Sequence, residues 1–160
     1  MQVQCPVCHM PVEPNQLILV YHRMHFAFCS EQCRERFQAA PHLYVGVPGQ
    51  KAPKQEGQEV LKRRCLRLDV APTAEQGRLI TEALGAMMGV RRIAVEGKAV
   101  DITYDLLETT EEQIERTLLE TGASLGSGWT ERLRRALVHY AEDCEASNME
   151  VTGRPPHHHG

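Results

Sequence analysis

Four cysteines near the start of the chain constrain its fold more than any other feature. Cys5 and Cys8 form a C-x-x-C pair, and Cys29 and Cys33 form a C-x-x-x-C pair. A pair in a tight turn and a pair at a helix start can direct four sulfurs at one ion, and four thiolates favour zinc. A block this small buries little apolar surface, so metal binding would contribute directly to its folding. The spacing therefore predicts a metal centre built by these four residues.

Two other interpretations of the cysteines stay open. Free cysteines are common in protein cores, and a C-x-x-C pair can also carry out redox chemistry, although the βαβ pattern expected beside such a pair is absent. The N-terminus has no basic start followed by an apolar run, so we expect a cytoplasmic protein. A reducing cytoplasm favours metal ligation over disulfides for close pairs.

Four further side chains near these cysteines carry donor atoms that a metal accepts. They are His9, Met10, His22 and His25. A lone histidine is more often a surface or packing residue than a ligand. His9 and Met10 are the best placed to tune the metal or to offer a softer contact to copper.

The composition limits the classes of function. Hydrophobic residues make up 42% of the chain and aromatic residues 5%, so the core must be mainly aliphatic. The formal net charge is −3, without the basic excess that a nucleic-acid surface shows. No apolar run reaches the roughly 18 residues that a membrane helix needs, so we expect no membrane insertion.

The first block, residues 1–46, has the elements of a small metal-binding domain. Apolar residues at 17–21 and 26–28 predict two strands, and Ser30 is a suitable N-cap for a helix over 31–40 that Pro41 ends. Residues 47–60 are polar and rich in glycine and proline, which predicts a linker.

The second block, residues 61–127, follows the order β-α-β-β-α-β. Leu66, Leu68 and Val70 alternate with polar residues as in a half-buried strand, and a helical pattern covers 73–88. A hairpin is predicted over 92–104, a helix begins at a capping box of Thr109 and Glu112, and 123–125 can supply a last strand. The sequence therefore predicts an α+β protein, with a ferredoxin-like domain beside the small one.

A further helix is predicted over 128–147, followed by a loose tail over 148–160. Its apolar stripe comprises Trp129, Leu133, Leu137, Tyr140 and Cys144. Cys65 is out of phase with Leu66, so it should lie on the sheet face that the two other helices leave open. We expect the stripe to cover that face, in the same chain or in a homodimer, and Cys144 to be buried there rather than to form a metal site with Cys65. The tail residues His157, His158 and His159 are either a loose nickel or copper site or solvated.

The first block resembles a YHS domain, one of the TRASH-type, treble-clef metal-binding modules. The resemblance covers about residues 3–45 and rests on the following residues: Cys8-His9-Met10, Tyr21-His22, Phe28-Cys29-Ser30, Cys33, Phe37, Pro41 and Tyr44. Typical members begin Asp-Pro-Val-Cys-Gly-Met, so here Cys5 replaces the aspartate and His9 the glycine. The resemblance implies Cys8, Cys29 and Cys33 as ligands, while Cys5 is added from spacing. It also implies metal trafficking or sensing, because such modules occur beside copper-transporting ATPases and heavy-metal resistance proteins.

Residues 63–125 resemble a heavy-metal-associated domain. The resemblance rests on Val70-Ala-Pro-Thr-Ala-Glu-Gln-Gly and on the apolar and glycine positions that follow it up to Gly122. That family binds soft metals by Met-x-Cys-x-x-Cys, but Pro72, Ala74 and Gly77 stand at the three ligand positions here. The resemblance thus implies the fold without its metal site, in a degenerate domain used for docking or dimerisation.

These features predict a soluble accessory protein in heavy-metal, copper-linked trafficking, sensing or resistance. It would hold one ion, Zn²⁺ or alternatively Cu⁺, and dock on a heavy-metal transporter or another metal-handling protein. The alternative is an interaction adaptor with a permanent structural zinc. We expect no enzyme and no catalytic residues, because four thiolates leave no open coordination position and the acidic residues look like solvated helix faces.

Overall fold

The structure is a computed structural model that describes residues 1–152 of the chain. As expected, the fold is α+β. The chain forms two compact units, each described here by itself. Of the described residues, the N-terminal unit comprises Met1–Glu59 together with residues 143–152, and the second unit comprises Val60–Glu142.

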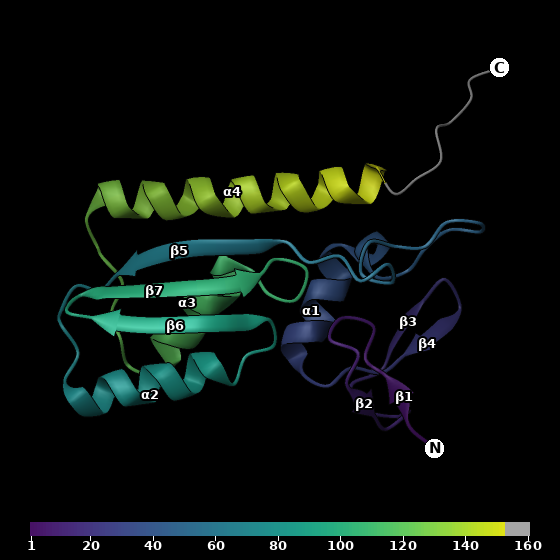
Figure 1. Cartoon of the computed structure of the whole chain (residues 1–160), viewed down its shortest axis with the longest axis horizontal. Coiled ribbons are helices and arrows are strands. Elements are labelled where there is room, and N and C mark those ends of the chain that lie inside the picture. Colours follow the sequence, from purple (N-terminus) through teal and green to yellow (C-terminus); the bar gives the residue numbers. More distant parts are fainter. Residues whose placement is uncertain (153–160) are drawn as a thin grey trace. The chain divides into compact units, whose positions relative to one another are not determined.

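Two small hairpins and one helix form most of the N-terminal unit (Figure 1). The strands pair antiparallel as β1 with β2 and β3 with β4. The elements are β1 Val3–Gln4, β2 Pro11–Val12, β3 Leu19–Tyr21, β4 Met24–Phe26, α1 Glu31–Ala39 and a 3-10 helix over Pro41–Leu43. The predicted strands and helix are therefore present, with bounds shifted by one or two residues.

The core of this unit is built around one aromatic ring. Phe37 of α1 is fully buried. Its ring lies 4.9 Å from that of Phe26, 5.3 Å from Phe28, 5.6 Å from Tyr21 and 6.0 Å from Tyr44, measured between centroids. Both the β3–β4 hairpin and α1 are thus tied to the same side chain, which fixes the helix start relative to the hairpins.

The segment predicted as a linker packs on the N-terminal unit over part of its length. Ala52, Pro53 and Lys54 are buried, and the Lys54 backbone N–H donates to the carbonyl of Leu43 at 2.9 Å. The reason is that small and stiff residues can fold into turns that pack closely, despite their lack of periodicity.

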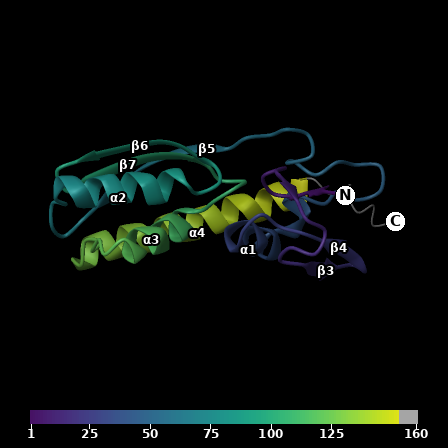
Figure 2. The same cartoon turned by 90° about the horizontal axis from the view of Figure 1, so that it is seen from below.

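The second unit is a three-stranded antiparallel sheet of order β5-β7-β6 with helices on one face (Figure 2). Its core consists of aliphatic side chains from β5, α2, β7 and α3 together with Tyr104. The elements are β5 Leu61–Arg67, α2 Ala74–Gly85, β6 Val90–Glu96, β7 Ala99–Asp105, α3 Glu111–Glu120 and the first part of α4 Trp129–Thr152. Strand β5 begins and ends earlier than predicted, so Val70 lies beyond it and is exposed.

The last strand of the predicted ferredoxin-like order is reduced to one bridge. Leu125 pairs with Leu68, and the backbone N–H of Gly126 donates to the carbonyl of Arg67 at 2.8 Å. Asp69 then accepts a hydrogen bond from the backbone of Ser127 at 2.9 Å. This carboxylate holds the chain in a turn right after the bridge, so the strand cannot extend along β5.

Helix α4 lies along the free edge of β5, beside α3, instead of over the open sheet face that carries Cys65 (Figure 1). A guanidinium nitrogen of Arg134 donates to the carbonyl of Cys65 at 3.2 Å, and one of Arg135 donates to that of Gly126 at 2.9 Å. The expected position over the sheet of the same chain was wrong. The edge without a fourth strand leaves carbonyl groups unpaired, and α4 supplies donors for them.

The face of α4 that meets the second unit is polar. Its predicted apolar stripe is exposed instead, with 76% exposure for Trp129, 48% for Leu133, 59% for Leu137 and 70% for Tyr140. The prediction that this stripe is buried within the same chain was wrong, because Arg64, Tyr104 and two glutamates of α3 give α4 polar partners. Its burial in a homodimer stays a prediction. Among residues 1–152, no helix is long and apolar enough to cross a membrane.

Two helices of the second unit begin with capping boxes. Thr73 and Gln76 cap α2, and Thr110 and Gln113 cap α3, each side chain bonding the backbone of the other residue. The second box lies one residue later than predicted, because the side chain of Thr109 is fully buried and its hydroxyl contacts the Gln113 side chain at 3.3 Å.

We expect Thr73→Ala to lower the free energy of unfolding by about 1 kcal/mol, because the N-cap bond to the Gln76 N–H is lost. Thr81→Ala is the matched control, since Thr81 is an exposed threonine inside the same helix. This control should be neutral or slightly stabilising. Urea denaturation of both variants measures the difference, and equal effects would contradict the capping role.

Candidate metal centre

The turn between β1 and β2 positions the first cysteine pair. The backbone N–H of Cys5 donates to the carbonyl of Met10, and that of His9 donates to the carbonyl of Cys5, both at 2.9 Å. These bonds close a tight loop around Pro6 and Val7, which places Cys5 and Cys8 on the same side of the turn.

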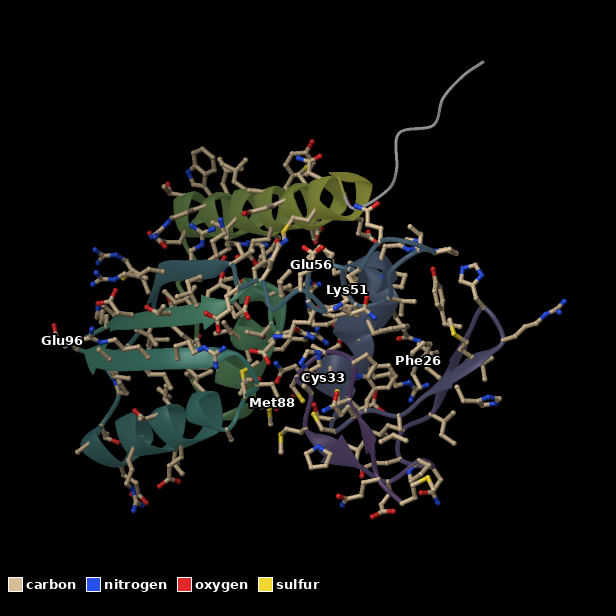
Figure 3. The ribbon with its side chains drawn as sticks, turned by 45° about the vertical axis from the view of Figure 1, so that its right-hand side comes forward. Phe26, Cys33, Lys51, Glu56, Met88 and Glu96 are labelled. Carbon is tan, nitrogen blue, oxygen red and sulfur yellow. The ribbon has the colours of Figure 1, made fainter. Side chains whose placement is uncertain are left out.

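The start of α1 positions the second pair. Ser30 is the N-cap, and its hydroxyl accepts from the backbone N–H of Cys33 at 3.4 Å. Cys29 directly precedes the cap, and the side chain of Gln16 donates to its carbonyl at 3.3 Å. Cys33 follows in the first turn (Figure 3). The free N–H groups and the dipole of the helix stabilise thiolate charge at this end.

The four sulfurs converge on one point. All of them lie within 4.8 Å of one another, with 3.3 Å between Cys8 and Cys29 and 3.4 Å between Cys29 and Cys33. Tetrahedral zinc with Zn–S bonds of about 2.3 Å places its sulfurs about 3.8 Å apart. The cluster therefore fits a four-thiolate ion after small adjustments.

The two sides of the cluster differ in solvent access. Cys5 and Cys33 are fully buried, whereas Cys8 and Cys29 are partly exposed. An ion held here would be closed off on one side and reachable from solvent on the other.

Hydrogen bonds among the thiols shift their pKa values unevenly. The bond with Cys33 lowers the pKa of Cys29 to about 7, and bonds with Cys29 and Cys33 lower the pKa of Cys5. The bond with Cys29 raises the pKa of Cys8 and that of Cys33. The thiols therefore share protons, and a metal ion would replace those protons, since the thiolate is the ligand form.

The neighbouring histidines lie outside the cluster. His9, Met10, His22 and His25 are exposed, and none of the three histidines belongs to the group of clustered donor atoms. His9 instead has a backbone role. Its φ is +64°, in the left-handed region, at the turn where typical YHS sequences carry glycine.

We expect His9→Gly to raise the free energy of unfolding by up to about 1 kcal/mol, because a left-handed backbone costs a side-chain-bearing residue about 1–2 kcal/mol and glycine little. Metal content should stay unchanged. His25→Gly on β4 is the matched control and should destabilise by about 0.5–1 kcal/mol. Denaturation of the metal-loaded protein provides the measurement, and a less stable His9→Gly variant would contradict this account.

The other two cysteines, Cys65 and Cys144, build no second thiolate site in the described part of the chain. Cys65 and Cys144 are each partly buried, and neither joins a group of three or more ligands among residues 1–152. His157, His158 and His159 lie outside the described residues.

The loop before α2 carries no side-chain ligand at the positions where a heavy-metal-associated domain has them. Pro72, Ala74 and Gly77 line a shallow groove of about 460 Å³ together with Val95. The side chains at these three positions thus offer no metal-binding atoms, as expected from the sequence.

The structure also contains a second group of metal-ligating atoms that the sequence analysis does not predict. Glu111, Glu115 and His139 come together between α3 and α4, within 4.8 Å of one another. The two glutamates were interpreted as parts of a solvated face, but both are buried. Their spacing of one helical turn was the available signal, while the sequence did not show that His139 would lie opposite them.

Comparison with protein families identifies the segment that holds the four cysteines. A model of the YHS domain matches residues 3–47. A search of curated proteins and a search of solved structures each found no match. The resemblance of residues 63–125 to a heavy-metal-associated domain stays a prediction. Residues 3–47 of this chain therefore match the YHS domain, and this segment contains the whole cysteine cluster.

Proposed function

We propose that this protein is a metal-binding accessory protein in heavy-metal, copper-linked trafficking, sensing or resistance. One ion per chain is held by Cys5, Cys8, Cys29 and Cys33, with Zn²⁺ as the resident ion and Cu⁺ as the ion it exchanges for. The convergence of four thiols within a YHS domain carries this proposal. Such a donor set suits both metals, because thiolates are soft ligands.

Exchange requires that an incoming ion can reach the sulfurs. The partial exposure of Cys8 and Cys29 gives that access, and Cu⁺ binds thiolates strongly enough to compete with zinc. Since four thiolates leave no open coordination position, the site suits binding and transfer rather than catalysis. The second unit, without ligands at Pro72, Ala74 and Gly77, would serve as the docking part toward a heavy-metal transporter.

A second candidate is an interaction adaptor with a permanent structural zinc. The complete burial of Cys5 and Cys33 favours it, because closed four-thiolate sites hold zinc tightly and contribute to folding. In this case the exposed stripe of α4 would be the contact surface, including a contact between two copies of the chain.

Elemental analysis before and after a challenge with Cu⁺ and a chelator separates the two candidates. The wild type, Cys5→Ser and the control Cys65→Ser are purified and treated in parallel. The proposed function predicts that Cu⁺ displaces zinc from the wild type and from Cys65→Ser. One zinc per chain that resists the challenge and is lost with Cys5→Ser would support the adaptor instead. Zinc-free and copper-free wild type throughout would contradict both.

A further inference from the structure

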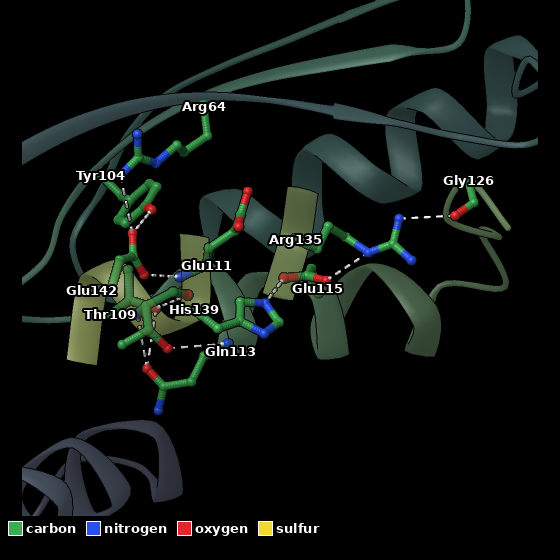
Figure 4. A network of polar contacts seen from close by, with 11 residues as sticks. Arg64, Tyr104, Thr109, Glu111, Gln113, Glu115, Gly126, Arg135, His139 and Glu142 are labelled. Atoms are coloured by element: carbon green, nitrogen blue, oxygen red, sulfur yellow. Dashed lines mark hydrogen bonds and ion pairs between the residues drawn. The ribbon is translucent and has the colours of Figure 1, made fainter. Parts of the chain in front are cut away.

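Helices α3 and α4 bring three metal-ligating side chains together in the second unit, away from the cysteines in sequence. Glu111 and Glu115 lie one turn apart on α3, and His139 lies on α4. One donor atom from each residue lies within 4.8 Å of the other two. The imidazole nitrogen Nε2 of His139 directly contacts the carboxylate of Glu115 (Figure 4).

One oxygen of the Glu111 carboxylate is buried without a hydrogen-bond partner. The residue is 3% exposed, and its Oε2 is a buried atom with no hydrogen-bond partner. A buried carboxylate oxygen normally has a donor or a cation beside it, because leaving it unpaired is costly. An atom of this kind next to an imidazole and a second carboxylate suits the binding of a cation.

Charged side chains of both signs surround the cluster. Arg135 pairs with Glu115 at 3.1 Å, and Arg64 lies 3.8 Å from Glu142. Glu142 already accepts a hydrogen bond from the backbone N–H of Glu111 at 2.9 Å. Burial and the charges of Glu115 and Glu142 raise the pKa of Glu111 to about 7. Two guanidinium groups and the imidazole of His139 thus face three carboxylates.

A groove gives solvent and ions access to the cluster. It has a volume of about 420 Å³ and is lined by Glu115 and His139, with Leu119, Leu125 and Arg132 among its other walls. The side chain of His139 is 29% exposed, so the imidazole lies at the boundary between the buried carboxylates and the groove. An ion at this place would keep coordination positions open toward water.

We propose that Glu111, Glu115 and His139 form a second metal site, which binds a divalent transition-metal ion such as Zn²⁺. The donor set of one imidazole nitrogen and two carboxylate oxygens suits zinc better than copper(I), which prefers thiolates, and better than calcium, which requires more oxygens. Binding replaces the contact between His139 and Glu115 by bonds from both to the ion. The site is thus chemically distinct from the cysteine cluster.

The test is a zinc titration of the full chain, with the cysteine cluster already loaded with one zinc. All samples carry His157→Ala, His158→Ala and His159→Ala, so that the tail cannot bind the metal. Equilibrium dialysis and elemental analysis give the stoichiometry, and NMR of the His139 ring nitrogens reports on the proposed ligand directly. The variants are Glu115→Gln, His139→Gln and, as a matched control on the exposed end of α3, Glu120→Gln.

The expected result is a second zinc per chain and a shift of the His139 Nε2 signal. Glu115→Gln and His139→Gln should weaken the second zinc at least about tenfold, whereas Glu120→Gln should retain it. The first zinc should stay in every variant, and unchanged amide protection of β7 shows that the second unit remains folded. A wild type that stops at one zinc, or whose His139 signal does not shift, would overturn the proposal and leave the cluster as an ion-pair network.

Discussion

The variant Cys33→Ser is expected to lose its metal ion and to unfold the N-terminal unit. Cys33 is fully buried within the sulfur cluster, and α1 begins right before it. Structural zinc in small domains contributes about 10–16 kcal/mol of apparent binding free energy near neutral pH, which is also folding free energy. Few apolar groups apart from those around Phe37 can replace that contribution in so small a unit.

Elemental analysis and amide hydrogen exchange together measure this effect. The zinc content should fall by one ion per chain, and amides of α1 should exchange far faster while those of β7 stay protected. Cys144→Ser is the control, because Cys144 lies outside the cluster, and it should retain both metal and protection. A Cys33→Ser protein that keeps its ion and its protected α1 would show that three thiolates suffice.

Replacing Glu142 by leucine is expected to lower the free energy of unfolding by about 3–5 kcal/mol, the range measured when one partner of a buried ion pair is removed. Glu142 is 2% exposed and accepts hydrogen bonds from the Tyr104 hydroxyl and the Glu111 backbone. Without the carboxylate, these two donors and the Arg64 guanidinium lose their partner in the interior (Figure 4).

The matched control is Asp143→Leu, the same kind of change at the next residue of α4. Asp143 is exposed, so its replacement should alter stability by no more than about 0.5 kcal/mol. Denaturant titration of both variants yields the difference, and the zinc of the cysteine cluster should remain in each. Equal stabilities of Glu142→Leu and Asp143→Leu would contradict a buried role for this carboxylate.

The cysteine cluster could be predicted from spacing because its geometry is local. Cys5 and Cys8 are fixed by one turn, and Cys29 and Cys33 by one helix start, so each pair depends on a few neighbouring residues. Spacing alone did not reveal which sulfurs are buried. That difference depends on how Phe37 and the hairpins pack around α1, which is not encoded in any short pattern.

The position of α4 could not be predicted from the sequence, because the spacing of its apolar residues indicates a different buried face from the one in the structure. Trp129, Leu133 and Tyr140 form a regular apolar stripe, and burial of such a stripe is the normal expectation. Here Arg64 and Glu111 lie at the edge of the core and require polar partners, which Glu142 supplies. The need to pair these polar groups therefore sets the orientation of α4. This need arises only once the sheet and α3 have formed.

The use of α4 to cover the β5 edge has a consequence for synthesis in the cell. The ribosome makes all residues of the sheet before Arg134 and Arg135, so the nascent sheet passes through a period with an open edge strand. Synthesis proceeds at about 5–20 residues per second, and an open edge during that time can pair with other chains. Mutations that weaken α4 should therefore appear first as a lower yield of protein, before any change in bound metal.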